Sequence, residues 1–266
     1  MMYVVERRQT RSILANLLIK VNEDQLSLTG TDLEVEMISK TKIEDPESGE
    51  ITIPARKIYE IVRALPDASQ LSVYQSDDKI TLQAGRSRFT LATLPANDFP
   101  SIDKIEVTER IIIAEVLLKE LIERTAFAMA QQDVRYYLNG LLVDFPKTKL
   151  PCGASDGHPL TLGGTELKQA KAKDLKRQII LPRKGVMELQ RLLEGSDRQI
   201  ELEIARNHIR MKSFDVTFTS KLIDGSFPDY EGVIPIGADR EVKVAREVLR
   251  DALQRAAILS NEKYRV

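Results

Sequence analysis

Two acids and a histidine in short polar segments are the residues most suited to catalytic chemistry. Asp156 and His158 are separated by one residue, and Asp32 lies at the corresponding place 124 residues earlier. An aspartate and a histidine within hydrogen-bonding distance could act as a hydrolytic acid–base pair. The segment around Asp32 lacks a histidine, however, and no orienting or metal partner for the pair is evident. We therefore expect a protein that is not an enzyme.

Metal and disulfide chemistry are limited by the small numbers of suitable residues. Cys152 is the single cysteine, which excludes a disulfide framework and a thiolate zinc site and fits a reducing, cytoplasmic location. His158 and His208 are the two histidines, too few for a multi-histidine metal centre. We expect no metal and no cofactor. We also expect no membrane segment, because no stretch approaches the ~18 apolar residues that a membrane helix needs.

The overall charge leaves the choice of partner open. Among 266 residues, 39 Lys and Arg stand against 40 Asp and Glu, giving a net charge of −1. Binding to a polyanion depends on where the charges lie and not on their sum. A nucleic-acid partner is therefore still possible.

The chain repeats itself with a period of about 128 residues. Ile53–Lys57 resembles Leu181–Gly185, and in both copies a proline precedes a helical pattern of apolar residues. Alternating apolar residues over 200–204, 209–211 and 216–218 then predict antiparallel strands with one solvated face, which carries Glu201 and Glu203. The counterpart apolar positions in the first copy are Leu71, Val73, Ile80, Leu82 and Phe89. Both copies reach a Phe-Pro pair, at Phe99 and Phe227.

A second helix type and its following strand also repeat. Leu117–Met129 carries an amphipathic stripe that returns over 248–257. The segment Tyr137–Val143 is predicted to be a strand, with Ile13–Ile19 as its counterpart, and Ala154–Asp156 matches Gly30–Asp32.

These elements predict an α+β fold in which each copy has two helices packed on antiparallel sheet. We expect domains at 1–105, 106–236 and 237–266. The first copy is too short between Val5 and Leu14 to hold its first helix, and the third copy stops after one helix. Repeats of this kind can close into a ring, which leaves no free sheet edge.

The polar faces of the helices carry basic residues with acidic residues between them. One interpretation is an ordinary solvated face with i,i+4 ion pairs. The other is a mildly basic surface that attracts a polyanion without gripping it. Recurrence in every copy favours the second. The basic residues on the two most similar helices are Arg56, Lys57, Arg63, Arg183, Lys184 and Arg191.

Several long motifs in order along the chain resemble one known family, the bacterial beta sliding clamps, which are the processivity subunits of DNA polymerase III. The motifs are Leu26–Glu34, Gly85–Phe89, Leu94–Pro100, Gln132–Gly140, Ser155–His158, Pro182–Val186, Asp224–Tyr230 and Ala256–Lys263. The resemblance covers nearly the whole chain.

The resemblance implies a three-domain protomer of which the first helix and most of the third domain are absent here. It implies a head-to-tail homodimer that forms a ring around double-stranded DNA, with the helices lining the hole and no sequence-specific contacts. On this basis the DNA-binding residues are expected to be Arg56, Lys57, Arg63, Gln132, Tyr136, Tyr137, Arg183 and Lys184.

The resemblance also implies a cleft between the second and third domains that binds short peptides of the polymerase catalytic subunit, the clamp loader and repair polymerases. The second-domain part of this cleft would be Arg135, Tyr137, Leu138, Ser155, Gly157, His158, Leu160 and Pro235. Pro159 departs from the family, which usually has arginine there. A peptide-binding scaffold that never encircles DNA is a further alternative.

Overall fold

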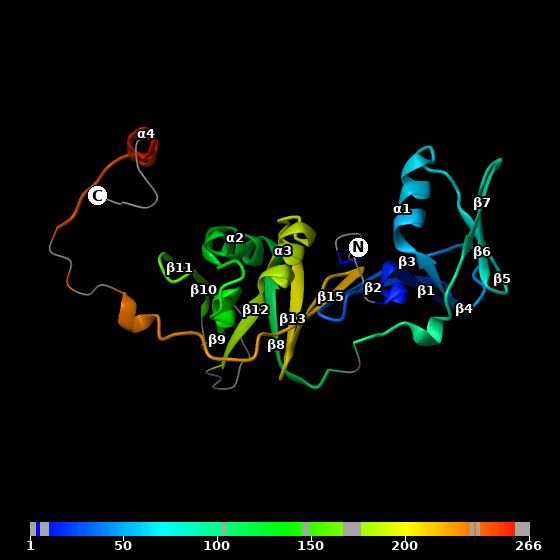
Figure 1. Ribbon diagram of the computed structural model, residues 1–266, viewed down its shortest axis with the longest axis horizontal. Coiled ribbons are helices and arrows are strands. Elements are labelled where there is room, and N and C mark those ends of the chain that lie inside the picture. Colours follow the sequence, from blue (N-terminus) through cyan, green and yellow to red (C-terminus); the bar gives the residue numbers. More distant parts are fainter. Residues whose placement is uncertain are drawn as a thin grey trace. The chain divides into compact units, whose positions relative to one another are not determined.

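The computed structural model describes residues 4–5, 11–102, 105–145, 149–166, 177–234, 237 and 240–258. Two units are recognised, Met1–Phe227 and Pro228–Val266. The second unit contains a short 3-10 helix, Glu231–Val233, and helix α4, Arg246–Ala257. All the sheet structure considered below belongs to the first unit (Figure 1).

The first copy of the repeat contains most of the expected strands and one α-helix among its described residues. Its strands are β1 (Asn16–Asn22), β2 (Gln25–Thr31), β3 (Val35–Lys42), β4 (Gly49–Pro54), β5 (Ser72–Ser76), β6 (Lys79–Ala84) and β7 (Ser87–Ala92), with helix α1 (Ala55–Ala64) after β4. The described residues before β1 include a 3-10 helix, Ser12–Ala15. Residues 6–10, in the segment predicted to be too short for a helix, lie outside the described part.

The second copy contains both helices. Its strands are β8 (Val107–Ala114), β9 (Gly140–Phe145), β10 (Lys149–Ser155), β11 (Leu160–Glu166), β12 (Arg177–Pro182), β13 (Gln199–Ala205), β14 (His208–Lys212) and β15 (Val216–Lys221), with helices α2 (Glu115–Thr125) and α3 (Arg183–Leu192). Strand β12 and helix α3 follow β4 and α1 with the same 128-residue offset that the sequence predicts. The repeat is therefore confirmed in the fold.

The strands form three sheets in which neighbouring strands are antiparallel. The order in the largest is β4-β1-β2-β3-β15-β14-β13-β8, and the smaller sheets are β11-β10-β9-β12 and β5-β6-β7. The large sheet passes from one copy to the other through β3 and β15, which pair from Ser39 and Val216 to Val35 and Ser220. The predicted α+β class is thus confirmed, and the two copies share one sheet.

The largest hydrophobic core fills the second copy, between its two sheets and its two helices. Phe218 on β15 and Val186 on α3 are fully buried in it, together with Leu121 on α2. Residues of β3, including Met37, extend the same core across the seam between the copies. The core of the first copy is smaller and contains Ile53 and Leu82.

Two strand predictions are wrong in detail. The predicted strands Ile13–Ile19 and Tyr137–Val143 both begin within 3-10 helices, Ser12–Ala15 and Tyr136–Leu138. The strands β1 and β9 start only after these helices. Both errors have the same cause, because an apolar run of this length does not distinguish a strand from a helical turn. The helix expected over Leu117–Met129 likewise ends at Thr125 and is followed by a 3-10 turn.

One side chain that the alternation assigned to the solvated face is buried. Glu203 on β13 exposes 1% of its surface, and its carboxylate meets Lys212 Nζ at 2.6 Å and Arg110 Nη2 at 3.3 Å. Long basic side chains on neighbouring strands cover the acid with their aliphatic stems. Glu201 keeps partial exposure, as expected.

The buried position of Val186 leads to a test of the core. We expect Val186→Ala to lower the free energy of unfolding by about 2 kcal/mol, because two buried methyl groups are removed and a small cavity remains. Val134, which is 95% exposed, provides the control, because Val134→Ala should change the free energy of unfolding by less than about 0.5 kcal/mol. Urea unfolding of both variants measures the difference, and equal midpoints would contradict the assigned core.

Among the described residues, no helix is both long and apolar enough to cross a membrane.

Candidate functional site

A tight turn after β10 forms one part of the candidate site. Ser155 Oγ donates a hydrogen bond to the carbonyl oxygen of Pro159 at 2.8 Å and accepts one from the Gly157 backbone N–H at 3.0 Å. Asp156 Oδ1 accepts a hydrogen bond from the His158 backbone N–H at 2.9 Å. Gly157 has a φ of +93°, which other residues rarely adopt. Pro159 supplies only its carbonyl here, so this departure from the family leaves the turn intact.

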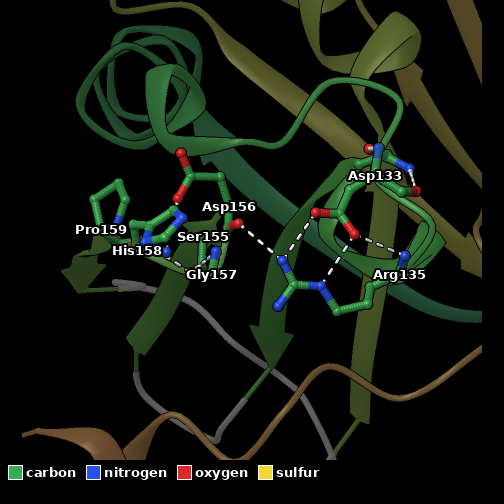
Figure 2. A network of polar contacts seen from close by, with 8 residues as sticks. Asp133, Arg135, Ser155, Asp156, Gly157, His158 and Pro159 are labelled. Carbon is green, nitrogen blue, oxygen red and sulfur yellow. Dashed lines mark hydrogen bonds and ion pairs between the residues drawn. The ribbon is translucent and has the colours of Figure 1, made fainter. Parts of the chain in front are cut away.

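The second part is a loop that places Arg135 beside this turn (Figure 2). Asp133 accepts from the Arg135 backbone N–H at 2.8 Å, from Nε at 3.0 Å and from Nη2 at 2.8 Å. Asn139 holds Asp133 in turn, accepting from its backbone N–H and donating to its carbonyl, both at 2.9 Å. Arg135 Nη2 also donates to the Asp156 carbonyl oxygen at 3.1 Å, which joins loop and turn.

The electrostatics of this pair keep both groups charged. Hydrogen bonds from the Arg135 side chain, and then from its backbone N–H, lower the pKa of Asp133 to about 2. The side-chain hydrogen bonds to Asp133 raise the pKa of Arg135 above its ordinary value. The Arg135 side chain is 46% exposed. Among the described residues, no hydrogen bond uses its Nη1, so a fixed, charged donor is available to a ligand.

The apolar part of the predicted cleft is only partly represented. Leu138 is 3% exposed, whereas Leu160 at the start of β11 is half-buried. Leu162, two residues further on, is 39% exposed and was not among the predicted residues. Pro235, predicted to complete the cleft, lies outside the described residues.

The structure therefore brings together Arg135, Ser155 and Gly157 as predicted, with half-buried Tyr137 and exposed His158 nearby in the chain. Asp133 was missed, and Asp156 was considered only for catalysis and not for holding Arg135 through its carbonyl oxygen. The sequence did contain a signal for Asp133, because an aspartate side chain in a loop often accepts a hydrogen bond from the backbone N–H two residues later.

The hydrolytic alternative finds no support in this geometry. Asp156 bonds the backbone of His158 and not its imidazole, which is the behaviour of a turn residue. Within the described part of the chain, no three potential ligands among His, Cys, Asp and Glu gather to hold a metal ion.

The predicted DNA-binding residues on α1 are exposed. Arg56 pairs with Glu60 at 2.9 Å and Lys57 with the same carboxylate at 3.8 Å, so part of their charge is balanced locally. The hydrogen bond from Arg56 has the largest effect on Glu60 and, with the nearby charge of Lys57, lowers its pKa. Arg63, in the last turn, is exposed as well.

The predicted residues on α3 are more enclosed. Arg183 Nη1 donates to the Met129 carbonyl oxygen at 3.1 Å. Lys184 forms an ion pair with Asp32 of the first copy, and the side chain of Asp32 is almost fully buried. These two basic residues therefore anchor α3 to neighbouring segments as well as presenting charge.

The loop before β9 supplies the last predicted DNA contacts. Gln132 is exposed and has a φ of +57°. Tyr136 is 57% exposed, and its ring meets that of Tyr137 edge-to-face, with 5.9 Å between centroids. Both tyrosines lie in the 3-10 helix Tyr136–Leu138, whereas Tyr137 was predicted to begin a strand.

Comparison with known proteins identifies the family. Residues 1–103 match the N-terminal domain of the DNA polymerase III beta subunit, and residues 112–229 match its central domain. The beta sliding clamp of Pseudomonas aeruginosa is 50% identical over 98% of this chain and 71% of its own length.

Two solved structures show the same fold. A sliding clamp from Pseudomonas aeruginosa bound to griselimycin has a TM-score of 0.92 at 49% identity, covering 98% of this chain and 70% of that one. A Caulobacter crescentus beta sliding clamp, with polyethylene glycol bound to its proposed beta-motif tethering region, has a TM-score of 0.86 at 39% identity. The match covers 98% of this chain and 70% of that one. From its repeat, its fold and these matches, the chain belongs to the beta sliding clamp family of DNA polymerase III beta subunits, whose members are non-catalytic processivity factors in DNA replication.

Proposed function

We propose that the chain works as a protomer of a head-to-tail homodimeric ring that encircles double-stranded DNA. Exposed Arg56, Lys57 and Arg63 on α1 support this proposal, with Glu60 between them moderating the positive charge. A mildly basic lining attracts phosphates without sequence preference and lets the ring slide, because each contact is weak and screened. Enclosure, not affinity, then keeps the ring on the duplex.

We further propose that a short peptide of the partner protein binds beside Arg135 and the Ser155–Pro159 turn. The single observation that carries this proposal is the fixed guanidinium of Arg135, held by Asp133 and the Asp156 carbonyl with Nη1 still available. Such a donor fits a backbone carbonyl or carboxylate of an extended peptide. An apolar peptide side chain placed against Leu160 and Leu162 would add roughly 1.5–3 kcal/mol of binding free energy if fully buried.

Two relatives have been solved with a bound molecule, which supports the proposal that this fold binds ligands. The Pseudomonas aeruginosa clamp was solved with griselimycin, and the Caulobacter crescentus clamp with polyethylene glycol at its proposed beta-motif tethering region. By extension, the partners of this chain would be the catalytic subunit of DNA polymerase III, the clamp loader and repair polymerases. Tethering makes rebinding of the polymerase to its template intramolecular, at a high effective concentration.

Three smaller proposals complete the assignment. The domain boundaries are 1–105, 106–236 and 237–266, His158 contributes to the peptide site, and the protein acts in the cytoplasm. The exposed position of His158 supports the second of these.

A topological experiment tests the ring. The full chain is placed on nicked circular DNA with a clamp loader and ATP, and protein–DNA complexes are separated from free protein by gel filtration. We expect the protein to stay with the circle and to be lost when a restriction enzyme linearises it, because a ring slides off a free end. Equal retention on both forms would overturn the ring and favour a scaffold that never encircles DNA.

A further inference from the structure

The turn that carries the candidate peptide site has a structural twin in the first copy. Thr31 Oγ1 donates to the Val35 carbonyl oxygen at 2.9 Å and accepts from the Leu33 backbone N–H at 3.1 Å. Asp32 Oδ1 accepts from the Glu34 backbone N–H at 2.9 Å. Each bond has its counterpart in the turn that begins at Ser155, 124 residues later.

The backbone conformation is also shared by the two turns. Leu33 has a φ of +77°, close to the +93° of Gly157 at the corresponding place. A leucine at such a φ is strained, because its Cβ crowds the neighbouring carbonyl. The first copy therefore presents an apolar side chain where the second copy presents none.

A cavity of about 470 Å³, called the junction pocket here, opens beside this first-copy turn. Its walls include Leu33, Ile102, Ile105, Arg206, His208 and Lys221. The first three come from the first copy and the segment after it, and the last three from strands β14 and β15 and the turn before β14. This volume lies in the range of pockets that hold small ligands.

The pocket has an apolar side and a basic side. Leu33 is 37% exposed and, with Ile102 and Ile105, offers apolar surface. Arg206, His208 and Lys221 supply the basic side, and Glu106 is the one acid among the lining residues. Within the described part of the chain, no ion pair engages Arg206 or Lys221. The basic side therefore has positive charge to offer to a ligand.

His208 lines the junction pocket and also a second cavity next to it. Its Nε2 atom is buried and makes no hydrogen bond to any described residue. His208 also stands directly opposite Lys221 in the antiparallel pairing of β14 and β15. Burial, and then the nearby charges of Lys221 and Arg210, lower the pKa of His208. In the tautomer that carries its proton on Nε2, this nitrogen is an unpaired donor, and the two nearby cations favour an acceptor with negative charge.

We propose that the junction pocket binds a short acidic peptide, with its carboxylate at His208 and Lys221 and an adjacent aliphatic side chain against Leu33 and Ile102. Charge complementarity selects the acidic group, and the apolar wall selects its neighbour. This is a second peptide site, on the first-copy turn, and it does not depend on binding at Arg135. The protein then has two turns of one design, each forming part of a binding site.

Photocrosslinking to the full chain tests the site. The probe is acetyl-Asp-photoleucine-Leu-amide, and the matched probe replaces Asp by Asn. After irradiation, mass spectrometry locates the crosslinked residues. We expect the acidic probe to label residues 100–102, 105–106 or 205–208, and the Asn probe to label them about tenfold less, because the charge-assisted hydrogen bond is lost.

Variants separate this site from the one at Arg135. We expect Lys221→Met and His208→Gln each to reduce labelling at the junction pocket severalfold, whereas Lys79→Met on β6 and Arg135→Ala should leave it unchanged. His208→Gln is chosen over His208→Phe because glutamine keeps a polar side chain at this position, so the variant should still fold. Labelling confined to residues 135–160, or equal labelling by the two probes, would overturn the proposal.

Discussion

Replacing Glu115 by glutamine is expected to lower the free energy of unfolding at neutral pH by about 3 kcal/mol. Glu115 is the first residue of α2, and its side chain is 2% exposed. Its carboxylate accepts hydrogen bonds from the backbone N–H groups of Glu194 and Gly195, from Ser196 Oγ at 2.6 Å and from Arg198 Nε at 2.9 Å. A glutamine amide can accept some of these bonds but presents its NH₂ group to the other donors.

The same carboxylate predicts how stability depends on pH. Burial alone would raise the pKa of Glu115, but the hydrogen bonds from Ser196, Arg198, Gly195 and Glu194 outweigh it and lower the pKa from 4.5 to about 2. A group whose pKa is lower in the folded state stabilises the fold above its unfolded pKa. Its contribution is therefore complete above pH 4.5 and is lost as the pH falls toward 2.

Urea unfolding at several pH values tests both statements. The stability difference between the wild type and Glu115→Gln should shrink steadily between pH 4.5 and pH 2. Glu194→Gln is the control, since that side chain is 75% exposed and its ion pair with Arg198 contributes less than about 1 kcal/mol. A difference that stays constant with pH would show that the carboxylate is not the group responsible.

Replacing Gly157 by alanine is expected to weaken peptide binding at Arg135 by about 30-fold while the protein stays folded. A Cβ at this position would lie 2.6 Å from Arg135 Nη2 and 2.7 Å from Nη1, and the φ of +93° is unfavourable for alanine. The guanidinium must therefore move. A hydrogen bond to a charged group contributes roughly 1.5–3 kcal/mol, so its loss corresponds to a factor of about 10–150 in affinity.

Gly85→Ala provides the matched control. Gly85 also has a positive φ, +56°, but an added Cβ there meets no atom within 4 Å. Fluorescence anisotropy with a labelled peptide from the polymerase catalytic subunit measures the affinity, and thermal unfolding checks that both variants are folded. Unchanged affinity in Gly157→Ala, with normal affinity in Gly85→Ala, would remove Arg135 from the proposed site.

Local periodicity predicted most of the individual elements. The alternation of Ile200, Leu202 and Ile204 identified β13, and the stripe beginning at Leu117 identified α2, because each pattern reports directly which face is buried. The 3-10 helix at Tyr136–Leu138 was missed because a single helical turn leaves no periodicity to detect.

Contacts between distant segments could not be predicted in the same way. Nothing in the residues near Glu115 indicates that donors at 194–198 surround it, since an acid in a first helical turn is commonly solvated. The pairing of Lys184 with Asp32 joins two copies, and a repeat pattern contains no information on how its copies meet. The peptide residues at Arg135 and Ser155 came from family resemblance, while their support by Asp133 came from the structure.

The shared sheet has a mechanical consequence. Backbone hydrogen bonds in an antiparallel ladder run perpendicular to the strands. A load that slides β3 along β15 is therefore carried by all the pairs from Val216–Ser39 to Ser220–Val35 at once. A load that peels the strands from one end breaks the pairs in succession. The joint between the copies should accordingly be stiff in shear and weakest at its ends, beside Glu34 and Asp215, where single backbone bonds continue it.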